Sequence, residues 1–81
     1  MARIPRDLSG AQLIRALQKM GYERSRQSGS HVRLSHAGPP QHHVTVPLHD
    51  ALRLGTLAGI LDSVAATHYL SRETLLESLL A

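Results

Sequence analysis

The chain has 81 residues, enough for one domain with a modest core, and it lacks cysteine, which excludes disulfides and thiolate zinc sites. Its longest apolar runs are far shorter than the about 20 residues needed to cross a bilayer, and its first residues lack the apolar core of a signal peptide. We therefore expect a cytoplasmic, soluble protein without membrane contact. The net charge is +3, and eight of the nine basic residues are arginine, which favours an anionic partner such as nucleic acid.

A first helix is predicted over about residues 9–20. Ser9 and Gln12 have the spacing of a capping box, in which each side chain accepts a hydrogen bond from the backbone of the other residue. Leu13, Ile14 and Leu17 then form one apolar stripe at helical spacing, and Gly21 is expected to follow the end of the helix.

The segment that follows predicts three antiparallel strands. Residues 22–27 and 30–36 flank a Ser28-Gly29 turn, which is typical of a β-hairpin. A looser turn over residues 37–41 leads to a third strand over 42–46, which Pro47 ends because proline cannot donate a ladder hydrogen bond.

Two further helices are expected after a loop over residues 48–54. Thr56 is the expected N-cap of the first, and Gly59 inside it indicates either a close packing contact or simple tolerance. The last helix, over 71–80, has four leucines on one face, so a homodimer stays open as an alternative to a monomer. The chain is thus predicted to be a single α+β domain over 1–81, with a core region over 9–66 and an extra C-terminal helix.

Side-chain alternation divides the predicted sheet into an apolar and a polar face. A Ser28-Gly29 turn would place Arg26 opposite His31 and Arg24 opposite Arg33, with Ser25 on the apolar face. The apolar face contains Val32, Leu34, Val44 and Val46. The polar face would contain Tyr22, Arg24, Arg26, His31, Arg33, His43 and Thr45, without a carboxylate.

This polar face has the residue types that RNA cleavage requires. Histidine can give and take protons near neutral pH, and a guanidinium binds phosphate oxygens in a fork geometry. His31, with Arg26 expected across from it, therefore indicates an acid–base group beside a phosphate clamp. A surface with mixed signs of charge would be more usual for a face that is merely solvated.

Four stretches of the sequence together resemble the HicA (YcfA-like) toxin family. They are Gly21 with the aromatic residue after it, Arg26-Gln27-Ser28-Gly29-Ser30-His31, Val44-Thr45-Val46-Pro47-Leu48-His49 and Arg53-Leu54-Gly55-Thr56-Leu57. The family consists of mRNA interferases of HicAB toxin–antitoxin modules. The resemblance implies a double-stranded-RNA-binding-domain-like fold, an essential histidine at the position of His31, mRNA as substrate and a HicB-like antitoxin as partner.

The leading hypothesis is a metal-independent endoribonuclease that uses no cofactor. His31 would act as the base or the proton shuttle, and Arg24, Arg26 and Arg33 would hold the phosphate. The proton donor stays open between His43, His49 and Tyr22. The alternative is a non-catalytic RNA-binding module of the same fold. A zinc site built from histidines is disfavoured because the neighbours His42 and His43 would point to opposite faces of a strand.

Overall fold

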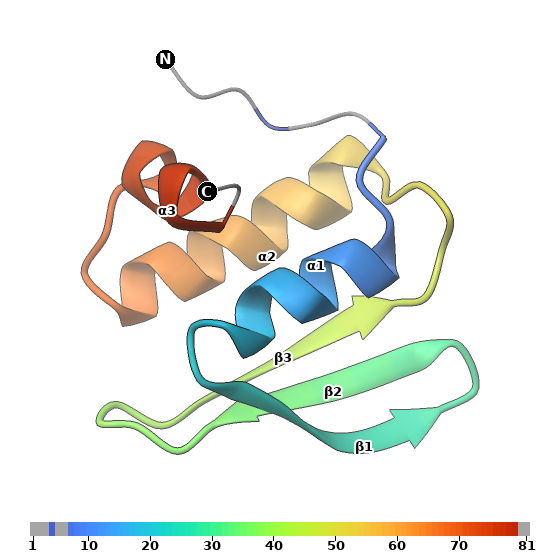
Figure 1. The fold of residues 1–81 in the computed structure, drawn as a ribbon, viewed down its shortest axis with the longest axis horizontal. Coiled ribbons are helices and arrows are strands. Elements are labelled where there is room, and N and C mark those ends of the chain that lie inside the picture. The colour runs from blue at the N-terminus through green and yellow to red at the C-terminus, as the bar shows by residue number, and fades with distance from the viewer. Residues whose placement is uncertain (1–3, 5–6, 80–81) are drawn as a thin grey trace.

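The computed structural model describes residue 4 and residues 7–79, and it has the predicted order of one helix, three strands and two helices. The elements are α1 (Gly10–Gln18), β1 (Tyr22–Ser28), β2 (His31–His36), β3 (His42–Pro47), α2 (Leu54–Thr67) and α3 (Arg72–Leu79). The strands form one antiparallel sheet in the order β1-β2-β3 (Figure 1). This arrangement confirms the predicted α+β class.

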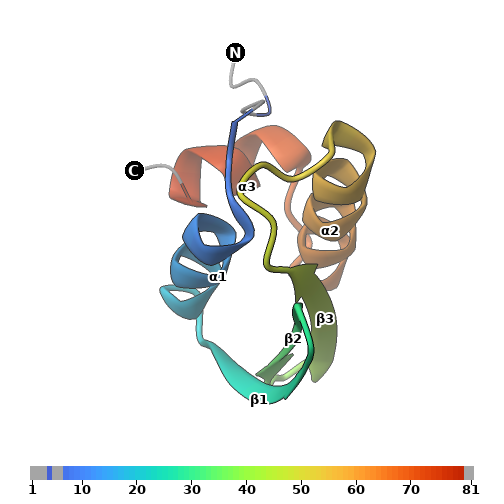
Figure 2. The ribbon, with the colours of Figure 1, turned by 90° about the vertical axis from the view of Figure 1, so that its right-hand side faces the viewer.

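The helices gather on one side of the sheet, and the opposite face of the sheet is left open by the described elements. α1 and α2 lie side by side over the strands, and α3 lies beyond them (Figure 2). The apolar face predicted from the sequence is confirmed, since the side chains of Val32, Leu34, Val44 and Val46 are buried beneath these helices. This burial orients the sheet, so the alternate residues of β2 and β3 face solvent.

The start of α1 has the predicted capping box. The backbone N–H of Gln12 donates to Oγ of Ser9 at 3.1 Å, and the backbone N–H of Ser9 donates to Oε1 of Gln12 at 2.9 Å. Leu13, Ile14 and Leu17 are buried, as their spacing predicts. Gly21 follows in a left-handed conformation with φ of 98°, which a glycine adopts without steric cost.

The pairing of β2 with β3 is as predicted, but the pairing of β1 with β2 is not. The turn consists of Gly29 and Ser30, so Ser28 rather than Gln27 begins the pairing, opposite His31. A β-bulge between Arg24 and Arg26 then shifts the register once more. A bulge inserts an unpaired residue and reverses the alternation of side chains beyond it.

α2 begins three residues earlier than the expected N-cap at Thr56 implies. Arg53 is the N-cap and makes no side-chain capping hydrogen bond, so the prediction that Thr56 caps the helix is wrong. Leu57, Leu61 and Val64 are buried on the face toward the sheet. No atom lies within 4 Å of a Cβ built on Gly59, so this glycine is tolerated rather than required.

α3 folds onto the same core. Oγ of Ser71 accepts a hydrogen bond from the backbone N–H of Thr74 at 3.1 Å, which caps the first turn. Three of its leucines, Leu75, Leu76 and Leu79, are buried in the domain's own core, while the predicted Leu80 lies outside the described residues. The leucine-rich face is therefore used within the chain, and the homodimer stays a prediction. None of the helices described is long and apolar enough to span a membrane.

Candidate functional site

The open face of the sheet is formed by alternate residues of the three strands, and we call it the outer face. β2 contributes His31, Arg33 and Ser35, and β3 contributes His43 and Thr45. The cross-strand pairs Ser35–His43 and Arg33–Thr45 agree with the sequence-based register. The helices pack on the other side of the sheet (Figure 2). Of the five side chains, that of Ser35 is half-buried and the others are exposed.

His31 lies at the first position of β2 and is exposed on the outer face, as predicted. Its cross-strand partners are Ser28 and Pro47, so the expected pairing of His31 with Arg26 is wrong. The residue two positions further along the same strand and face is Arg33. The imidazole therefore has a guanidinium as its neighbour along the strand instead of across it.

Two arginines face each other at the centre of the outer face. Arg26 of β1 pairs with Arg33 of β2, and both line a shallow cleft of about 230 Å³ together with Ser25, Ser35 and His43. Like charges placed directly opposite each other destabilise a sheet. A bound anion such as phosphate would remove that cost, because two guanidinium groups can share its oxygens.

The bulge places Ser25 on the outer face, contrary to the prediction. Oγ of Ser35 donates to Oγ of Ser25 at 2.9 Å, and the Ser25 hydroxyl donates to the backbone carbonyl of Arg33 at 3.3 Å. The same Ser35 oxygen lies 2.8 Å from Nδ1 of His43. A hydrogen-bonded chain thus runs from His43 across all three strands.

The bulge also changes the positions of the first residues of β1. Arg24 pairs with Leu34 rather than with Arg33, and Glu23 pairs with Ser35. Both line a neighbouring cleft of about 330 Å³ and are absent from the lining of the smaller one. The prediction that the outer face has no carboxylate is therefore wrong, since Glu23 lies at its edge.

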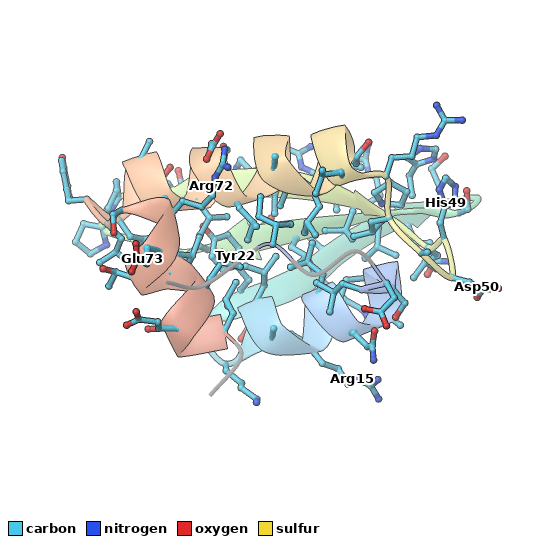
Figure 3. The ribbon with its side chains drawn as sticks, turned by 90° about the horizontal axis from the view of Figure 1, so that it is seen from above. Arg15, Tyr22, His49, Asp50, Arg72 and Glu73 are labelled. Atoms are coloured by element: carbon cyan, nitrogen blue, oxygen red, sulfur yellow. The ribbon has the colours of Figure 1, made fainter. Side chains whose placement is uncertain are left out.

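Tyr22 is not on the outer face at all, so it is removed from the candidate proton donors. Its side chain is only 1% exposed, and Figure 3 places it beneath the helices. Its hydroxyl lies 2.7 Å from Nδ1 of His42 and 3.0 Å from Nε2 of His68, and burial raises the pKa of Tyr22 above its ordinary value. This phenol is a buried structural group.

Three histidines surround Tyr22 at the end of the sheet. The rings of His36, His42 and His68 lie 5.0 to 5.8 Å from the tyrosine ring, and Nε2 of His42 is 2.9 Å from Oγ of Ser63 on α2. Burial, and secondarily the other histidines nearby, lowers the pKa of His42 and of His68. The contribution of His68 had no signal in the sequence, because it comes from the turn after α2.

His49, the remaining candidate proton donor, is exposed in the loop after β3 (Figure 3). Its backbone carbonyl accepts a hydrogen bond from the N–H of Gly10 at 3.0 Å, which ties this loop to the start of α1. The preceding Leu48 donates to the carbonyl of Ser30, so His49 lies at the hairpin end of the sheet, where β2 begins.

The structure gives no support to a histidine metal centre. Among the described residues, no group of three or more histidine or carboxylate side chains could hold a metal ion. His42 faces the Tyr22 cluster and His43 the outer face, as the alternation of strand residues requires.

The fold and the site define a small α+β domain with an open face that carries histidines and opposed arginines. A family model described as HicA toxin of bacterial toxin-antitoxin matches residues 10–64, which cover α1, the sheet and most of α2. The chain therefore belongs to the HicA toxin family of toxin–antitoxin modules, and membership implies a HicB antitoxin as its partner. Searches of curated proteins and of solved structures found no match to this chain.

Proposed function

We propose that this HicA-family protein is a metal-independent endoribonuclease that cleaves mRNA on the outer face of its sheet. The observation that carries the proposal is the pairing of Arg26 with Arg33 beside an exposed histidine, His31. Two guanidinium groups that face each other repel when no anion is bound, but both are attracted to a phosphodiester placed between them. Family membership supports the same reading, because it places the chain among toxins.

In this proposal His31 is the general base. It removes the proton of a ribose 2′-hydroxyl, whose oxygen attacks the adjacent phosphorus while the bond to the 5′-oxygen breaks. Arg26 and Arg33 hold the phosphate and stabilise the charge that develops on its oxygens. Arg24 has a smaller part, because it lies beyond the bulge, outside the cleft that the other two arginines line.

A HicB antitoxin that covers the outer face would block this reaction. Binding of RNA duplexes as the main activity is disfavoured, because the first turns of α2 contain no basic residue and only Arg53 precedes them. The alternative of an RNA-binding module without catalysis predicts the same salt-sensitive binding but no cleavage.

The test is incubation of the purified protein with a long transcript, with and without EDTA, beside the His31→Ala variant. We expect cleavage by the parent in both buffers, at least about 100-fold slower cleavage by the variant, and none of a DNA of the same sequence. Equal rates for parent and variant would disprove the role of His31. Binding without cleavage would favour the non-catalytic alternative, and loss of activity with EDTA would disprove metal independence.

A further inference from the structure

We propose that His43 is the second acid–base group of this site, held in one tautomer by Ser35 and Ser25, and that it protonates the leaving 5′-oxygen. This inference rests on the proposed ribonuclease function and selects one of the two remaining candidates for the proton donor, His43 and His49. It assigns Ser35 and Ser25 as positioning residues.

The backbone carbonyl of Arg33 at the end of the hydrogen-bonded chain determines which group donates in each bond. The backbone carbonyl of Arg33 can only accept, so the Ser25 hydroxyl donates its proton there. Oγ of Ser25 then accepts from Ser35, and the Ser35 hydroxyl has no proton left for His43. Nδ1 of His43 must therefore carry the proton that bridges the 2.8 Å to Oγ of Ser35.

This direction leaves Nε2 of His43 as the nitrogen that exchanges protons. Among the described residues, no hydrogen bond involves that nitrogen. Nδ1–H donates to Ser35 in both the neutral and the protonated imidazole. The ring can therefore gain a proton at Nε2 and release it there without turning. A backing hydrogen bond that fixes the tautomer is how enzymes keep a catalytic imidazole oriented.

The position of His43 suits an acid that complements His31. Ser35, its cross-strand partner, lies four residues beyond His31, so the two histidines are roughly 13 Å apart along the strand direction. Arg33 lies midway between them on the same face. To reach the two sides of one phosphodiester, as an in-line displacement requires, both side chains must lean along the strand toward Arg33.

The proton and bond balance is then complete. His31 accepts the 2′-hydroxyl proton, the O2′–P bond forms, and the P–O5′ bond breaks. The imidazolium of His43 gives its Nε2 proton to the departing 5′-oxygen and remains as the neutral Nδ1–H form. The products are a 2′,3′-cyclic phosphate and a free 5′-hydroxyl, and no oxidant or metal takes part.

The experiment compares ordinary RNA with a substrate whose scissile 5′-oxygen is replaced by sulfur. A thiolate leaves without protonation, so it does not need a general acid. We expect His43→Ala to cleave ordinary RNA about 100-fold more slowly than the parent, but the sulfur substrate within about tenfold of the parent's rate. His31→Ala should be slow on both substrates, because attack still needs its base.

The positioning residues are tested by Ser35→Ala, with the exposed Ser78 of α3 as a matched control in Ser78→Ala. We expect about tenfold slower cleavage for Ser35→Ala and the parent's rate for the control. Correlation of ring nitrogens and protons by NMR should find the Nδ1–H tautomer of His43 in the parent and a shift toward Nε2–H in Ser35→Ala. That spectrum does not depend on activity, and thermal unfolding checks that the variants fold.

The outcomes separate this inference from the function on which it rests. A parent that cleaves neither substrate overturns the proposed function and the acid role together. An active parent with an equally active His43→Ala, or equal losses on both substrates, overturns only the acid role. Rescue by sulfur in His49→Ala instead would assign the acid to His49, and an Nε2–H tautomer in the parent would refute the hydrogen-bonded chain.

Discussion

The Tyr22 hydroxyl lies 3.0 Å from Nε2 of His68, which joins the first residue of the sheet to the turn that follows α2. The same oxygen lies 2.7 Å from Nδ1 of His42 on β3. One phenol thus connects β1, β3 and the end of α2. Because its proton can go to only one neighbour, the other histidine must donate to it.

Replacement of Tyr22 by phenylalanine should destabilise the protein by about 1–3 kcal/mol, since it leaves ring nitrogens of His42 and His68 without their partner. The measurement is urea unfolding at neutral pH. Tyr69→Phe is the matched control, because Tyr69 is 91% exposed, and its change should stay within about 0.5 kcal/mol. Equal midpoints for both variants would show that the phenol network contributes nothing to stability.

Acid should destabilise the protein through the histidines that contact Tyr22. Burial lowers the pKa of His42 and of His68 below their ordinary value of 6.5, so the unfolded chain binds protons more readily at these positions. Their contribution is therefore complete above pH 6.5 and is lost as the pH falls through the lowered values. The positive charge of the nearby His68, His43 and His36 adds to the lowering of the pKa of His42. Asp62, whose pKa is lowered by its hydrogen bond to Arg72, affects stability only in more acidic solution.

The measurement is the urea midpoint at about pH 7.5 and about pH 5, with the parent expected to be less stable at the lower pH. The stability of the double variant His42→Gln, His68→Gln should depend less on pH over this range. If the parent were equally stable at both values, protonation of these histidines would not oppose folding.

Two glycines should respond to alanine in opposite directions. A Cβ on Gly10 would lie 1.9 Å from the carbonyl oxygen of Pro47, where the start of α1 passes the end of β3. Gly10→Ala should therefore cost about 2 kcal/mol or more, because backbone must move. Gly59→Ala meets open space inside a helix and should stabilise the protein by about 1 kcal/mol. The measurement is thermal unfolding of the parent and the two variants. If Gly10→Ala were as stable as the parent, the close approach of α1 to Pro47 would be refuted.

The parts of the sheet that the sequence predicted correctly are those with buried alternate residues. Val32 and Leu34 on β2 face Val46 and Val44 on β3, and a slip of one residue would expose all four. This pattern fixed the register, and with it the outer positions of His43 and Thr45. The helices followed in the same way from their apolar stripes and from the capping box at Ser9.

The first strand offered no such pattern. After Tyr22 every residue of β1 is exposed, so the strand has no apolar pattern from which its register could be predicted. The position of the turn and the bulge at Ser25 therefore left no mark in the sequence. The sequence therefore placed Tyr22 and Ser25 on the wrong faces, paired Arg24 with Arg33 instead of Leu34, and missed Glu23 at the edge. The cluster around Tyr22 could not be predicted either, because His68 reaches it from the turn after α2, which is far from the strands in the sequence.

The corrected register predicts which arginines bind RNA. Arg33 and Arg26 line the central cleft and Arg24 does not, so Arg33→Gln should weaken binding clearly more than Arg24→Gln. The measurement is affinity for a single-stranded transcript over a series of salt concentrations, where each lost phosphate contact lowers the slope by about 0.7. Arg24→Gln keeps the same loss of net charge and is therefore the matched control. Because opposed guanidinium groups repel each other in the free protein, Arg33→Gln should also leave its stability unchanged or raise it slightly. If both variants lost affinity equally, net charge rather than the Arg26–Arg33 pair would govern RNA binding.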